Sequence, residues 1–342
     1  MSKLFSEIKI KNLDIKNRIV MPPMCMYCAK EDGKVTPWHI QHYATRAIGG
    51  TGLIIVEATG VCPEGRISSN CLGLWNDNQI EGMKQLVDTV HEYGAKIGIQ
   101  LNHAGRKCTA SNVVVEAPSP IAFDENSVVP VEMSIDDINA TVEEFKSAAA
   151  RAEEAGFDVI EIHAAHGYLL NEFLSPLTNK RIDEYGGSKE NRVRIVGSVL
   201  DAVKEVWPDD KAICIRVTAE DYQDGGNKAE DLAEMINMIK DKGIDVVHVS
   251  TGGVVSVLPD VFPGYQIPHA EIIKTETGLP VIGGGLITEA EFAEELIAEQ
   301  KCDMVYVGRL LLRNPYWPLN ASVELDADFQ WPKQYERGKP RK

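Results

Sequence analysis

Residues 52–58 read Gly-Leu-Ile-Ile-Val-Glu-Ala, and the run Leu53-Ile54-Ile55-Val56 inside them shows no alternation of apolar and polar side chains. A strand that is buried on one face alternates, whereas a parallel strand that is covered on both faces is apolar along its length. This stretch therefore predicts a strand of a parallel sheet that other elements cover on both sides.

Short apolar runs of this kind recur along the chain with helical patterns between them. Runs that predict further strands occupy residues 18–21, 96–101, 159–163, 212–217, 246–250, 280–283 and 304–307. Helix starts are indicated by N-cap or capping-box residues, namely Thr36-Pro37, Ser134 with Asp137, and Thr288 with Glu291. Helix ends are indicated by glycines, namely Gly49-Gly50, Gly94 and Gly156.

About eight repeated strand–helix units predict an α/β protein, with a closed (β/α)₈ TIM barrel over residues 1–342 as a single domain. An open doubly wound sheet is the second choice, and it is weakened because no G-x-G-x-x-G follows the first strand.

Three segments fall outside the repeat. Ile8, Ile10, Leu13 and Ile15 predict a small N-terminal β-hairpin that closes the bottom of the barrel. Residues 102–133 form a long excursion after the third strand, and such excursions lie at the C-terminal mouth of barrels and shape the site. A polar C-terminal tail runs from about residue 323 to the end.

The composition limits the possible partners. The formal net charge is −16, so nucleic acid and anionic membrane surfaces are not expected as partners, because both repel an acidic protein. No apolar run is long enough to span a bilayer, and the first residues lack the apolar region of a signal peptide, so a cytoplasmic location is expected. The seven cysteines are then expected to be free thiols.

The end of the fourth strand carries the richest set of reactive side chains. His163, His166 and Tyr168 follow one another there, where barrels hold their catalytic groups. The two imidazoles can donate to a carbonyl oxygen that gains negative charge, and the phenol can supply a proton. A metal site is the other possibility for the histidines, but no third ligand is evident nearby, so no metal is expected.

Other strand ends offer groups for a ligand. Gln100 can offer a donor and an acceptor to the edge of a heterocycle. Arg216 lies inside an apolar run, so it is expected either in a salt bridge or against an anionic ligand. The glycines at 283–285 and Gly308-Arg309 follow the seventh and eighth strands, where barrels often bind phosphate. Cys25-x-x-Cys28 alone is a weak redox or metal signal. These features fit an aldolase or isomerase as well as a flavoenzyme.

Four strings decide between these classes: MPPMCMY at 21–27, IQLNHAGRK at 99–107, VGRLLLRNP at 307–315, and EIHAAHGYLLNEFLSPLTNKRIDEYGGSKENR at 161–192. They resemble the old yellow enzyme family, in particular its thermophilic-like branch, and the similarity extends from about Leu4 to Arg337. The resemblance implies an FMN-dependent ene-reductase that takes hydride from NADPH or NADH and passes it to an activated alkene such as an enone, in ping-pong fashion.

The resemblance also implies residue roles. FMN would be bound non-covalently by Pro22, Pro23, Met24, Cys25, Ala58, Gln100, Arg216, Gly284, Gly285, Gly308 and Arg309. His163 and His166 would bind the enone carbonyl, Tyr168 would donate the proton, and Tyr27 would line the substrate pocket. Arg337 would reach into the site of a neighbouring subunit, which implies a homodimer or homotetramer and places the tail at 323–342 at the interface.

Two competing functions remain at this point. One is a flavin-free barrel lyase or isomerase that acts on a phosphorylated substrate, although no predicted strand offers an obvious catalytic lysine. The other is a flavin carrier, which would have no need of the proton donor Tyr168.

Overall fold

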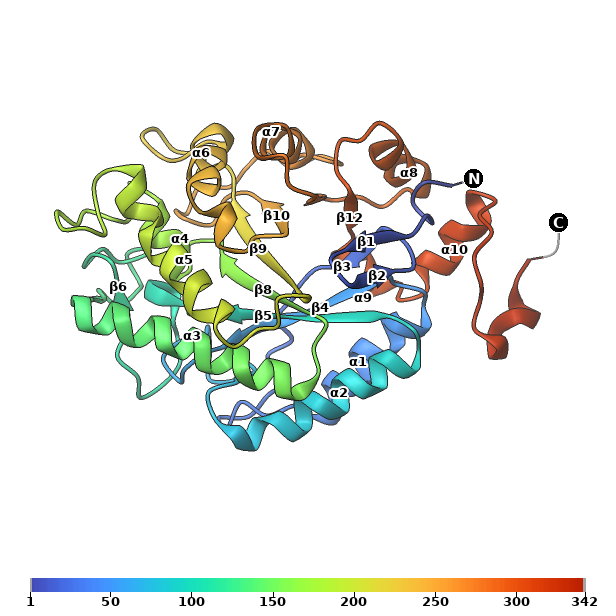
Figure 1. Ribbon diagram of the computed structural model, residues 1–342, viewed down its shortest axis with the longest axis horizontal. Coiled ribbons are helices and arrows are strands. Elements are labelled where there is room, and N and C mark those ends of the chain that lie inside the picture. Colours follow the sequence, from blue (N-terminus) through green and yellow to red (C-terminus); the bar gives the residue numbers. More distant parts are fainter. Residues whose placement is uncertain (1, 341–342) are drawn as a thin grey trace.

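The computed structural model describes residues 2–340 and contains a closed barrel of eight parallel strands (Figure 1). In chain order the barrel strands are β3 (Ile19–Met21), β4 (Leu53–Gly60), β5 (Lys96–Asn102), β8 (Val159–Ala164), β9 (Ala212–Thr218), β10 (Val246–Ser250), β11 (Val281–Gly283) and β12 (Met304–Tyr306). Each strand pairs with the next, and β12 closes the barrel on β3. The (β/α)₈ prediction is confirmed.

Helices cover the outside of the barrel (Figure 1). They are α1 (Pro37–Ile48), α2 (Ile80–Glu92), α3 (Ile135–Ala155), α4 (Leu169–Leu174), α5 (Lys189–Lys204), α6 (Ala229–Ile239), α7 (Ile267–Thr277), α8 (Ala290–Ala298), α9 (Arg309–Arg313) and α10 (Trp317–Glu324), with 3₁₀ turns η1 (Asp77–Gln79), η2 (Gly105–Lys107), η3 (Lys240–Lys242) and η4 (Lys333–Gly338). Helix α3 begins with the predicted capping box of Ser134 and Asp137, and it ends at Gly156 in the left-handed conformation with a φ of 89°.

One predicted helix start is wrong. Thr288 with Glu291 was expected to cap the helix that became α8, but this helix begins at Ala290 with Glu289 as its N-cap. The Thr288 hydroxyl donates to the Glu289 carboxylate, and the Thr288 carbonyl accepts a bond from the Trp317 indole. The contact with Trp317 belongs to the packing of α10, which the local sequence does not reveal.

The N-terminal hairpin closes the bottom of the barrel as predicted. Strands β1 (Ile8–Ile10) and β2 (Leu13–Ile15) pair antiparallel. Their buried side chains form one cluster with residues that begin barrel strands, among them Leu53, Val159, Ala212 and Val246. Because these are the first residues of parallel strands, the hairpin lies at the N-terminal end of the barrel, opposite the end where barrels bind substrates.

The excursion after β5 lies at the mouth. It contains the short parallel pair β6 (Glu116–Ala117) and β7 (Val131–Glu132). Lys107, at its start, donates to the carbonyl oxygens of His166 and Gly253, which follow β8 and β10. The excursion therefore ties together loops at the C-terminal ends of two strands.

The tail leaves α10 at Glu324 and packs on the far side of the barrel from β6 and α4 (Figure 1). Phe329 lies against Phe5 with ring centroids 4.9 Å apart, and the Trp331 indole donates to Ser322. None of the helices between residues 2 and 340 has the length and apolar character that crossing a membrane requires.

Candidate active site

Three aromatic side chains meet at the end of β8, as the sequence predicts. The His163 and His166 ring centroids lie 5.2 Å apart, and the His163 and Tyr168 centroids lie 4.9 Å apart, both edge to face. His163 is buried, whereas His166 and Tyr168 are partly exposed. Three side chains with N–H or O–H groups therefore share one corner of the barrel mouth.

The protonation states suit hydrogen-bond donation by neutral groups. Burial, reinforced by the charge of Arg216, holds the pKa of His163 and of His166 well below its usual value, so both rings are neutral at pH 7. Burial raises the pKa of Tyr168, which keeps its phenolic proton in the same range. This corner can therefore polarise a carbonyl oxygen and donate a proton.

Local bonds orient the two histidines. His163 Nδ1 accepts a 3.2 Å bond from the backbone N–H of Ala165, which assigns the ring proton to Nε2. His166 has a φ of 59°, and its Nε2 lies 2.7 Å from the Ser250 hydroxyl. A carbonyl ligand would therefore find a free donor on His163, while on His166 it must use Nδ1 or displace the Ser250 hydroxyl.

Close packing of two loops requires glycine beside His166. Gly167 has a φ of 69°, and a Cβ built on it would lie 2.3 Å from the carbonyl oxygen of Gly253. Lys107 bridges the same loops, lies 5.2 Å from the centre of the Tyr168 ring, and has its pKa lowered by burial to about 8. No pattern in the sequence points to Lys107, because its contacts are to backbone atoms about 60 and 150 residues away.

Arg216 carries a buried charge with no direct protein partner. It pairs in register with His163 on β8 and with His248 on β10. Its Nε atom is buried without a hydrogen bond, and no ion pair among residues 2–340 involves it. Of the two interpretations of the sequence, the geometry favours an anionic ligand over a salt bridge.

The Gln100 side chain is buried inside the barrel, below its mouth. Its amide nitrogen donates a 2.7 Å bond to Glu161, and both side chains are fully buried. The other carboxylate oxygen of Glu161 accepts a 2.7 Å bond from His248 Nδ1. Burial alone would raise the pKa of Glu161, but His248 and Arg216 hold it below its usual value. Glu161 was missed, although a glutamate inside an apolar run is the same signal that pointed to Arg216.

The loop after β3 lies beside the ends of β4 and β12. A Cβ on Gly308 would lie 3.5 Å from Pro22 and 3.6 Å from the sulfur of Met24. The Cys25 thiol interacts with the Ala58 backbone and with Tyr27, which is 49% exposed. Burial raises the pKa of Cys25, so it remains a thiol. The structure thus brings Pro22 and Met24 close to Gly308, and Cys25 close to Ala58, all of which the resemblance assigned to FMN binding.

Glu57, which is not among the residues predicted from the sequence, holds this loop in place. Its buried carboxylate accepts a 2.8 Å bond from the backbone N–H of Met26 and a 3.3 Å bond from the Tyr43 hydroxyl. Like Glu161, Glu57 is a charged residue in the middle of an apolar strand, and that signal was available.

The glycine loops after β11 and β12 leave backbone donors free. Among residues 2–340, no hydrogen bond uses the backbone N–H of Gly284, Gly285 or Gly308. The side chain of Arg309 is exposed beside them. Buried oxygens of an anionic group would satisfy such donors.

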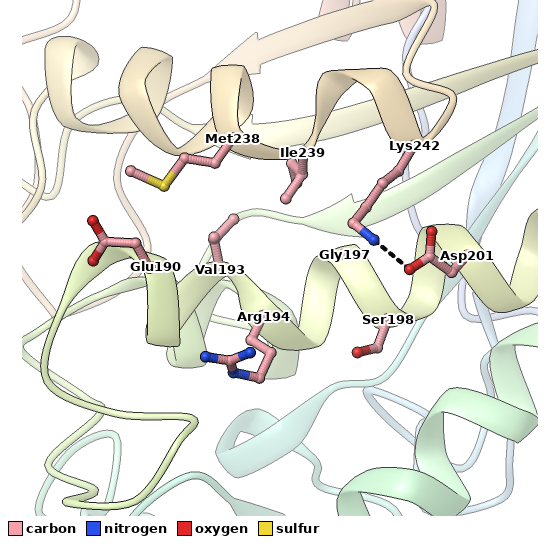
Figure 2. Close-up of a pocket in the computed structure, with 9 residues that line it drawn as sticks. All are labelled: Glu190, Val193, Arg194, Gly197, Ser198, Asp201, Met238, Ile239 and Lys242. Carbon is pink, nitrogen blue, oxygen red and sulfur yellow. Dashed lines mark hydrogen bonds and ion pairs between the residues drawn. The ribbon is translucent and has the colours of Figure 1, made fainter.

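Two features lie apart from this corner. Arg337 is exposed in η4 of the tail, and among residues 2–340 no hydrogen bond or ion pair joins it to the other predicted site residues. A groove of about 350 Å³ lies between α5 on one side and α6 with η3 on the other. Its lining residues are drawn in Figure 2, where Lys242 pairs with Asp201. Its lining comes from outer helices and includes no residue at a strand end, so it is not the reacting site.

Cys62, His103 and Glu144 place their polar atoms within 4.8 Å of one another. However, His103 Nδ1 already accepts a 3.2 Å bond from the Gly105 N–H. A neutral imidazole has one lone-pair nitrogen. This ring therefore has none left for a metal, and the cluster is interpreted as a hydrogen-bonded one.

Comparison with known proteins points to one group. A family model described as the NADH:flavin oxidoreductase / NADH oxidase family matches residues 3–328. The NADPH dehydrogenase of Geobacillus thermodenitrificans is 54% identical over 336 residues, covering 98% of this chain and 98% of that protein. Morphinone reductase superposes with a TM-score of 0.81 at 28% identity, over 97% of this chain and 92% of that one. The old yellow enzyme homologue from Zymomonas mobilis gives 0.80 at 28% identity, over 98% of each chain.

Proposed function

Because the chain belongs to the NADH:flavin oxidoreductase / NADH oxidase family and is an FMN-dependent oxidoreductase, we propose that it reduces the C=C bond of α,β-unsaturated carbonyl compounds with NADPH as hydride donor. The observation that carries this proposal is the meeting of His163, His166 and Tyr168 at the mouth, next to the unpaired charge of Arg216. A flavin-free lyase or isomerase does not fit the family match.

The described residues fit an FMN. The buried Nε of Arg216 lacks an acceptor, and an electron-rich ring edge would supply one. The free N–H groups of Gly284, Gly285 and Gly308, with Arg309 beside them, suit a phosphate. Pro22, Pro23, Met24, Cys25 and Ala58 would line the ring system, and Gln100 would contact it. In support, Pro22 and Met24 lie close to Gly308, and Cys25 lies close to Ala58. When bound, FMN would accept hydride from NADPH and supply it to the β-carbon of the alkene.

The residues of the chain would supply the polar part of the reaction. His163 Nε2 and the His166 ring would donate hydrogen bonds to the carbonyl oxygen, which withdraws electrons from the alkene. Tyr168 would donate its proton to the α-carbon, since its raised pKa keeps that proton available at neutral pH. Tyr27 would line the space for the substrate. With one mouth for both, NADPH and alkene would bind in turn, which gives ping-pong kinetics.

An absorption titration tests the proposal. The purified protein should show a flavin band that bleaches on anaerobic addition of NADPH and returns when cyclohexenone is added. A band that bleaches but returns only with oxygen would overturn the alkene substrate and leave an NADPH dehydrogenase. No flavin band, even after incubation with FMN, would contradict FMN binding itself.

A further inference from the structure

The interior of the barrel contains three layers of side chains, and the middle layer is polar. Alternate residues of a strand face the same side. The bottom layer includes Val159, Ala212 and Val246, which pack on the hairpin. Two residues further along β8 and β9 come Glu161 and Cys214, which are in register, and two further come His163 and Arg216. His248 of β10 is in register with Arg216 and reaches down to Glu161 through its Nδ1 bond. The polar layer therefore lies directly under the candidate active site.

Glu161 is the centre of this layer. Its side chain is completely buried, and it accepts bonds from Gln100 Nε2 and His248 Nδ1, both 2.7 Å long. The Cys214 thiol adds a weaker contact at 3.5 Å. All three neighbours act as donors, and a carboxylate that accepts from several donors is stabilised in its ionised form.

The charges of the two upper layers balance each other. Arg216, the next inward residue after Cys214 on β9, has no ion pair among residues 2–340. The hydrogen bond from His248 and the charge of Arg216 favour the ionised form of Glu161. An isolated buried guanidinium is costly, so a carboxylate one layer below stabilises Arg216 without occupying the face that a ligand would meet.

The same contacts determine how Gln100 faces the site. One N–H of its Nε2 is engaged by Glu161, so Oε1 and the second N–H of Nε2 remain for a ligand. Because the Glu161 carboxylate can only accept, Nε2 must face it, and the Oε1 atom of Gln100 is left as an acceptor for a ligand. The sequence alone left both orientations of this amide possible.

We propose that Glu161 is a positioning residue whose negative charge, held under Arg216 by Gln100 and His248, weakens the preference of the site for reduced over oxidised FMN and orients the Gln100 amide. This inference rests on the proposed function, since it concerns bound FMN. The reduced flavin carries extra negative charge, so a carboxylate below Arg216 opposes it electrostatically.

The test measures the dissociation constants of oxidised and reduced FMN, or equivalently the midpoint potential of the bound flavin, in Glu161→Gln. Removal of the negative charge should raise the ratio of the oxidised to the reduced dissociation constant at least tenfold, which corresponds to a potential more positive by about 30 mV for a two-electron couple. If Glu161 only maintained the shape of the site, its replacement would loosen Arg216. The reduced flavin would then be stabilised less, and the midpoint potential would become more negative instead of more positive.

Two variants complete the design. Glu161→Asp keeps the charge and should stay near the wild-type potential. Cys214→Ala lies in the same layer but removes no charge, and it should also leave the potential unchanged. If the flavin is bound and Glu161→Gln leaves its potential unchanged or more negative, the inference is wrong while the proposed function stands. If the wild-type protein binds no flavin, the proposed function fails first.

Discussion

At the scale of single residues, His163 and His166 differ in what already holds them. His163 Nδ1 accepts a hydrogen bond from the backbone of its own loop. This bond fixes the orientation of the ring and leaves its Nε2–H free to donate. His166 Nε2 is shared with Ser250 on a neighbouring strand. His163 is therefore the better preorganised donor of the two, and its removal should affect the reaction more directly.

For His163→Ala we expect kcat/KM with cyclohexenone to fall about 100- to 1,000-fold, the usual cost of losing one preorganised donor to a developing oxyanion. FMN should remain bound. Steady-state kinetics and the flavin absorption of the purified variant measure both quantities. His91→Ala, on the outer helix α2, is a matched control that should keep wild-type kinetics. Unchanged turnover in His163→Ala would refute the carbonyl role.

Glu57 should give the protein a pH-dependent stability. Burial raises its pKa from 4.5 to about 7, so the folded state keeps a proton that the unfolded chain has already lost. The stabilisation by the neutral form is complete below pH 4.5 and is lost as the pH rises through 7. Glu57→Gln is neutral throughout, so between pH 5 and 8 its free energy of unfolding should rise relative to wild type by up to about 3 kcal/mol.

Urea unfolding of the FMN-saturated proteins at several pH values measures this difference. The Gln side chain alters the bonds to Met26 and Tyr43, but the effect of this change on stability does not depend on pH. The change with pH of the difference in unfolding free energy therefore reports the titration of Glu57. A gap between the two proteins that stays constant from pH 5 to 8 would show that Glu57 does not titrate there.

At the scale of elements, α3 and α8 provide a matched pair. Ser134 accepts the backbone N–H of Asp137 at the start of α3, whereas Thr288 lies one residue before the N-cap of α8 and satisfies no helix N–H. Ser134→Ala should therefore cost about 1 kcal/mol of unfolding free energy. Thr288→Ala should cost less than about 0.5 kcal/mol. Equal losses in urea unfolding would contradict the assigned helix starts.

The element scale also separates what was predictable from what was not. All eight barrel strands were predicted to within two residues, because each is a short apolar run that ends where the chain leaves the core. The start of α8 was predicted wrongly, because Thr288 and Glu291 match a capping box locally while Thr288 packs under Trp317 of α10. Local patterns predict an element well when no distant partner competes for its end residues.

At the scale of the whole molecule, Arg337 belongs to the C-terminal tail, and the tail lies across the barrel from α4 and β6 (Figure 1). If it contacts substrate in a neighbouring subunit, Arg337→Ala should lower kcat/KM about 10- to 100-fold, as expected for a charge-assisted hydrogen bond. Size-exclusion chromatography with light scattering should give a dimer or a tetramer.

Mixed oligomers test this arrangement directly. Neither the His163→Ala nor the Arg337→Ala protein should be fully active by itself. In a mixed dimer, the Arg337→Ala chain supplies an intact His163, and the His163→Ala chain supplies the intact Arg337 that reaches the same site. In a dimer refolded or co-expressed from equal amounts, about a quarter of the sites would be intact if Arg337 acts across the interface. No recovery of activity on mixing would mean that Arg337 acts within its own chain or not at all.

The sequence by itself determined the barrel, its closing hairpin and the family, because these depend on apolar periodicity, on turn residues and on motifs that are continuous in the chain. It also determined that His163, His166 and Tyr168 meet, since they lie on one strand end. Only the tertiary structure decided what Glu57, Lys107 and Glu161 do. Their partners, apart from nearby Tyr43, lie about 30 to 150 residues away, and packing brings such groups together. The orientation of the Gln100 amide was likewise decided only by the tertiary structure. It depends on the Glu161 carboxylate from another strand, which the charge of Arg216 helps to keep ionised.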